Sequence, residues 1–80
     1  MSQYTATRLT RAQSIQQAKS DIRAHLAAYK KGQYSADWAG EEIDRIAAFY
    51  AAAAVDRYAA LAKRQIANRE AIRSAQNQEA

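Results

Sequence analysis

Apolar residues recur at helical spacing in the first third of the chain. Steps of three and four residues connect one stripe, which is formed by Ile15, Ala18, Ile22, Leu26 and Tyr29. Before this stripe, Thr10 and Gln13 have the spacing of a capping box, which marks a helix start. After it, two lysines precede Gly32, and glycine is the residue that most often ends a helix. The pattern predicts a helix at about 10–31.

The rest of the chain carries a second helical pattern without a strong breaker. Ser35 is a candidate N-cap, and the acidic residues that follow suit the positive end of a helix dipole. Positions 41–80 contain neither glycine nor proline, and alanine fills nine of the sixteen positions at 47–62. Because alanine is the strongest helix former, the simplest prediction is one continuous helix at about 36–75. The segments 1–8 and 76–80 are expected to be frayed ends.

This long helix would have apolar side chains on two sides. One stripe is formed by Ile43, Ala47, Tyr50, Ala54, Tyr58 and Leu61. Trp38 and Phe49 fall on a second side, and one short helix cannot cover both. We therefore expect an all-α helical hairpin that is completed as a homodimeric bundle. The alternative is a three-helix bundle with a break near residue 56, where Asp56 would cap a third helix.

Composition indicates one small helical domain that spans 1–80. Its length is near the lower limit at which a chain buries enough surface to fold alone. Cysteine is absent, which excludes disulfides and thiolate metal sites and favours a cytoplasmic location. The longest apolar run, at 46–55, is too short to cross a membrane, and no hydrophobic signal core occurs at the N-terminus. We expect a soluble protein without a membrane partner.

Groups that could support catalysis or bind metal are few. His25 is the single histidine and lies at the edge of the first apolar stripe, which favours packing over metal binding. Glu41, Glu42 and Asp44 lack the Glu-x-x-His partners of a di-metal helical bundle. The helix dipole and a Glu41–Arg45 pair explain these carboxylates adequately. We expect a protein that is not an enzyme and has no cofactor or metal.

Charge is distributed unevenly, although the net charge is only +4. Residues 1–35 hold six Lys/Arg and one Asp, residues 36–56 hold one Arg and five Asp/Glu, and residues 57–80 hold five Lys/Arg and two Glu. Basic stripes attract phosphates or acidic protein surfaces, although lysine and arginine stems also cover the rims of helical cores. In the first helix one basic side is formed by Arg8, Lys19, Arg23 and Lys30. The predicted partner-binding residues are Arg57, Lys63, Arg64, Arg69 and Arg73, with Lys30 and Lys31 as a second patch.

Three classes of function fit this charge layout. The first is a binding protein that inhibits or modulates a macromolecular partner, most simply another protein. The second is a nucleic-acid-associated helical dimer, whose DNA binding would depend steeply on salt. The third is a small structural or assembly subunit.

In general profile the chain resembles the small phage-encoded host-takeover proteins, of which the anti-CRISPR proteins are the best-known group. The resemblance rests on short length, absence of cysteine, a compact helical body and polarised charge, and the stretch "RAQSIQQAKSDIRAHLAAYKKGQYSADWAGEE" carries no diagnostic motif. It implies a protein in the host cytoplasm that binds a CRISPR effector subunit and blocks DNA recruitment or nuclease action. Many such inhibitors are strongly acidic DNA mimics. A net basic chain would instead bind an acidic or protein-only surface.

Overall fold

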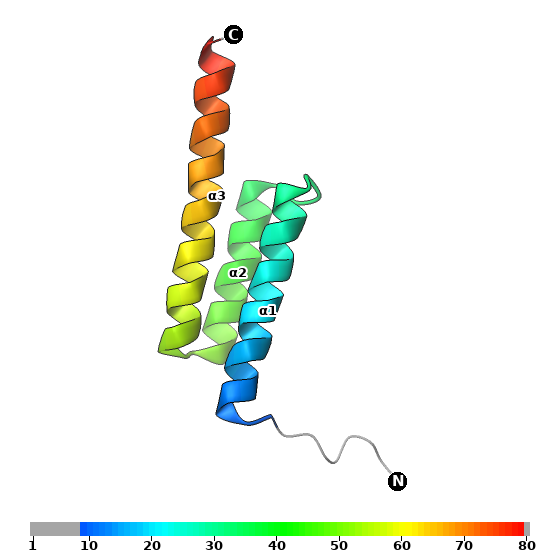
Figure 1. Ribbon diagram of the computed structural model, residues 1–80, viewed down its shortest axis with the longest axis vertical. Helices are drawn as coiled ribbons and strands as arrows, with labels where there is room; N and C mark the ends of the chain where they lie inside the picture. Colours follow the sequence, from blue (N-terminus) through cyan, green and yellow to red (C-terminus); the bar gives the residue numbers. More distant parts are fainter. Residues whose placement is uncertain (1–8, 80) are drawn as a thin grey trace.

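A computed structural model describes residues 9–79, and this part of the chain forms three helices. They are α1 (Arg11–Lys30), α2 (Ala36–Tyr50) and α3 (Ala53–Glu79), which run up, down and up beside one another (Figure 1). The all-α prediction is confirmed, and no strand occurs among the described residues. The expectation of a frayed segment at 1–8 lies outside them. No helix in the described range is both long and apolar enough to span a membrane.

The first helix forms where the sequence predicts it. The Thr10 hydroxyl accepts the N–H of Gln13 at 3.1 Å, and the Gln13 side-chain oxygen accepts the N–H of Thr10 at 2.9 Å, which completes the capping box. Gly32 follows the helix with a φ of 83°, a conformation that costs glycine little. Ser35 then caps α2, because its hydroxyl accepts the N–H of Trp38 at 3.1 Å. Both predicted ends of this turn are confirmed.

The predicted continuous helix at 36–75 is wrong. The chain turns at Ala51, which is left-handed with φ 51° and ψ 45°, and the Ala51 N–H donates to the Ala47 carbonyl at 2.9 Å. The structure agrees with the three-helix alternative, but the break comes about one helical turn before residue 56. Asp56 does not cap α3. Its N–H donates to the Ala52 carbonyl at 2.9 Å, within the first turn, where its carboxylate suits the helix dipole.

Burial explains why the helix breaks at an alanine. A left-handed alanine costs about 1–2 kcal/mol. Folding back lets α3 cover α1 and α2, and Ile22, Ile43 and Val55 become fully buried. Each such side chain contributes about 1.5–3 kcal/mol when it leaves water, so burial outweighs the strained residue.

The turn also resets which residues of α3 face inward. The core side of α3 consists of Val55, Ala59, Ala62 and Ile66. Leu61, which the predicted stripe places in the core, is 57% exposed, because that stripe assumed an unbroken helix. Phe49 at the end of α2 is 81% exposed, so the second apolar side of the predicted long helix is not covered at this residue.

The third helix is longer than the other two. Its 27 residues span about 40 Å, whereas the 15 residues of α2 span about 22 Å. Figure 1 shows its C-terminal part extending past the turn between α1 and α2. All side chains at 71–77 are exposed, as expected for a helix end without neighbours.

Candidate functional site

The three helices differ in charge. α1 holds four Lys/Arg and one Asp, α2 holds four Asp/Glu and one Arg, and α3 holds five Lys/Arg and three Asp/Glu. The side of the bundle between α1 and α3 therefore combines two basic helices. The sides that border α2 combine basic with acidic residues.

Contacts around Tyr58 show which basic residues of α1 lie beside α3. The Lys19 ammonium lies 5.7 Å from the centroid of the Tyr58 ring, within cation–π range. The Arg23 guanidinium donates to the Tyr58 hydroxyl at 3.4 Å. Lys30 lies on the same side of α1, because the helical repeat places it within about 20° of both Lys19 and Arg23 around the helix. Arg8, which the sequence places in this stripe, is outside the described residues.

α3 contributes Arg69 to the same side, and Arg73 follows one helical turn later and lines a common hollow with Arg69. The Arg69 guanidinium carbon lies 5.8 Å from the Tyr29 ring centroid, and the Arg73 guanidinium lies 3.6 Å from the Glu70 carboxylate. We call the resulting surface the basic face, formed by Lys19, Arg23, Lys30, Arg69 and Arg73.

The carboxylate of Glu70 is shared between this surface and the core. Tyr29 is buried, and its hydroxyl donates to Glu70 at 2.5 Å. Burial and the hydrogen bond to Glu70 both raise the pKa of Tyr29 above its ordinary value of 10.0. Because Glu70 accepts from Tyr29 and also faces Arg73, it neutralises only part of the basic face.

The structure divides the predicted partner-binding residues among different surfaces. Lys30, Arg69 and Arg73 lie on the basic face. Lys63 points toward α2 and pairs with both carboxylate oxygens of Asp44, at 2.8 and 3.0 Å. Lys31 is the C-cap residue of α1 and is exposed in the turn. Two of the basic-face residues, Lys19 and Arg23, were not predicted as binding residues, although the helical repeat already placed them beside Lys30.

Arg57 and Arg64 lie on a different side of α3. With Ala60 and Leu61 they line a shallow hollow of about 260 Å³. Arg64 is about 120° around the helix from Tyr58, so it faces away from the α1 side. These two arginines therefore cannot contact the same partner surface as Arg69 and Arg73 if that surface is flat.

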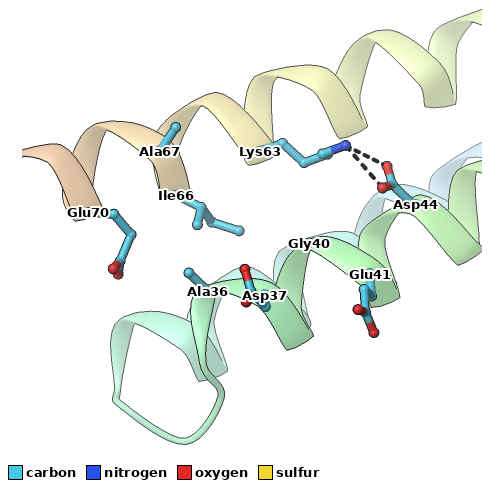
Figure 2. A pocket seen from close by; sticks show the side chains of 9 residues that line it. All are labelled: Ala36, Asp37, Gly40, Glu41, Asp44, Lys63, Ile66, Ala67 and Glu70. Carbon is cyan, nitrogen blue, oxygen red and sulfur yellow. Dashed lines mark hydrogen bonds and ion pairs between the residues drawn. The ribbon is translucent and has the colours of Figure 1, made fainter.

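A groove of about 370 Å³ separates α2 from α3 (Figure 2). Small residues and carboxylates predominate in its lining, which consists of Ala36, Asp37, Gly40, Glu41, Asp44, Lys63, Ile66, Ala67 and Glu70. The Lys63–Asp44 pair closes one end, and the Glu41 side chain points away from α3 (Figure 2). The groove is open and shallow, and Lys63 is the single cationic residue in its lining.

His25 and Arg45 have structural partners. His25 Nδ1 lies 2.9 Å from the Asp21 carbonyl oxygen, and its ring packs 5.6 Å from that of Tyr34. Arg45 pairs with Glu42 at 2.6 Å, not with Glu41 as predicted. Across residues 9–79, no group of three or more His, Asp or Glu side chains is placed to hold a metal ion.

Comparison of the chain with protein-family models, curated proteins and solved structures found no match in any of the three. The function must therefore be argued from the fold and its surfaces. These define a small three-helix protein whose charge is segregated by helix.

Proposed function

We propose that this protein is a non-enzymatic binding protein that docks its basic face on a negatively charged surface of a macromolecular partner and inhibits or modulates it. One observation carries the proposal. Five Lys/Arg side chains from two helices gather on one side, where Glu70 pairs with Arg73. Such a concentration of one charge favours rapid encounter with an acidic surface.

Several features of this face favour a protein as the partner. Arginine and tyrosine contribute most of the binding energy in many protein interfaces, and Tyr58 lies half-buried between Lys19 and Arg23. The Tyr58 contacts hold these side chains in place before binding, which lowers the entropy lost on association. The resemblance to phage-encoded host-takeover proteins leads us to propose an acidic surface of a CRISPR effector subunit.

The test is stoichiometric inhibition of target-DNA cleavage by purified CRISPR effector complexes. We expect the wild-type protein to inhibit at about equimolar ratio, and Arg23→Glu with Arg69→Glu to lose inhibition at least about tenfold, because like charges would face each other. Arg11→Glu with Arg45→Glu is the matched control, since it changes net charge equally away from the basic face. Equal inhibition by both double variants would exclude the basic face as the surface that binds the effector. Absence of inhibition by the wild type would exclude these effectors.

Nucleic acid is the second candidate, because the basic residues form a row. Lys19 lies at the level of Tyr58 on α3. From Tyr58 to Arg73 the helix rises about 22 Å, so the row of basic residues is as long as about six base-pair steps. Titration of a labelled DNA duplex at low and physiological salt tests this candidate. Tight binding that weakens steeply with salt would show that the basic face binds nucleic acid, and the proposal of a protein partner would be given up. Absence of binding at physiological salt would leave the protein partner as the proposal.

A further inference from the structure

The side of the bundle away from α1 carries opposite charges on its two helices. We call it the α2/α3 face. Its acidic half belongs to α2 and consists of Asp37, Glu41 and Asp44, and its basic half belongs to α3 and includes Arg57 and Arg64. Small residues lie among these charges, namely Gly40, Ala60 and Ala67. The face is thus acidic along α2 and, apart from Glu70, which accepts the Tyr29 hydroxyl, basic along the antiparallel α3.

We propose that the α2/α3 face pairs with the same face of a second copy of the chain, to form a two-fold symmetric dimer. A two-fold axis that runs parallel to the helices places α2 of one copy over α3 of the other, so acidic residues meet basic ones twice. An axis perpendicular to the helices would place α2 on α2 and oppose carboxylates. A foreign helix of either charge would match one half of the face and be repelled by the other. Charge complementarity therefore selects a second copy as the occupant and also selects the axis.

The Lys63–Asp44 pair shows which residues of α2 and α3 lie at the same level along the helix axes, and therefore which residues of the two copies would meet. This pair places residues 63 and 44 level in one copy. Under the parallel axis, Arg64 of one copy would lie about one residue from the level of Asp44 and about 3 Å from the level of Glu41 in the other. Arg57 would lie level with the C-terminal end of α2, where the helix dipole is negative. Both arginines would thus find a negative partner at the same time.

Gly40 supports close approach at this face. A glycine inside a helix costs about 1 kcal/mol relative to alanine, and a Cβ at Gly40 would meet no atom within 4 Å. Packing within one copy therefore gives no reason for glycine at this position. In the dimer, its small size would let the helix of the second copy approach the α2 backbone.

The main test is charge reversal measured by sedimentation equilibrium over micromolar to millimolar concentration. We expect the wild type to associate to a dimer that weakens with salt. Arg64→Glu and Glu41→Arg should each raise the dimer dissociation constant at least about tenfold, because each opposes like charges. The double variant Arg64→Glu/Glu41→Arg should bring the constant back to within about threefold of the wild type, because the pair is restored in the opposite sense.

Two further variants distinguish a specific role of the α2/α3 face from a general effect of net charge or stability on association. Gly40→Gln fills the groove without changing charge, so it should abolish the dimer while circular dichroism shows the helices intact. Arg23→Glu makes the same charge change as Arg64→Glu on the basic face and should leave the dimer unchanged. A wild type that stays monomeric at millimolar concentration and low salt would overturn the proposal, as would a double variant that fails to regain association. The dimer and the partner-binding function depend on different residues, so either can fail alone.

Discussion

The two turns of this bundle reverse the chain by different means. The turn between α1 and α2 has Gly32 at φ 83° and Ser35 as an N-cap, and its aromatic residues pack together, with ring centroids of Tyr34 and Trp38 6.3 Å apart. The turn between α2 and α3 has Ala51 in the left-handed region at φ 51°, followed by Ala52. Local sequence favours the first turn, whereas it favours continued helix at the second.

This difference shows where the energy of each reversal comes from. The first turn would form with little help from the rest of the molecule, because its residues suit their backbone conformations. The second depends on burial of residues that flank it, including Ile43 and Val55. Weakening the core should therefore affect the second turn more than the first.

The largest expected effect follows from removing part of that core. Ile43→Ala should lower the free energy of unfolding by about 2–5 kcal/mol, because it deletes a fully buried side chain between helices. Urea unfolding followed by circular dichroism measures the change. Hydrogen exchange should also quicken more at the Ala51 amide than at the Trp38 amide, because the second turn depends on this packing.

Ile72→Ala is the matched control for this prediction. Ile72 is 59% exposed on α3, so the same deletion should change the free energy of unfolding by less than about 0.5 kcal/mol. Equal losses at the two sites, or equal exchange at the two amides, would contradict the contrast between the turns.

Tyr29 gives a smaller effect, which depends on pH. Tyr29→Phe removes the hydrogen bond to Glu70 near the first turn and should cost about 1 kcal/mol at neutral pH. The pKa of Tyr29 is raised in the folded state, so its contribution is fully present below 10.0 and is lost as pH rises through the raised value. The stability gap between wild type and variant should therefore shrink above pH 10.0. A gap that stays constant to higher pH would show that Tyr29 is not shielded from ionisation.

Local signals in the sequence predict α1 and the start of α2. The capping box at Thr10, the positive φ of Gly32 and the cap at Ser35 each involve residues within a few positions, so their energies are visible in the sequence. The break at Ala51 has no such signal, because it is favoured by contacts with residues far along the chain. The same limit applies to surfaces. The helical repeat groups Lys19, Arg23 and Lys30, but the predicted long helix does not place Arg69 beside them.

The most direct test of the contrast exchanges the residue types at the left-handed positions of the two turns. Gly32→Ala should lower the free energy of unfolding by about 1 kcal/mol, since alanine is strained at positive φ. Ala51→Gly should instead raise it by up to about 1 kcal/mol, which corresponds to an increase in Tm of about 4–8 °C in a domain of this size. The sign of the change in the free energy of unfolding for Ala51→Gly is decisive. If α2 and α3 formed one continuous helix in solution, glycine at this position would cost about 1 kcal/mol and Tm would fall. Thermal unfolding of the two variants beside the wild type therefore tests whether burial in the bundle outweighs the strong helical preference of the alanine-rich segment.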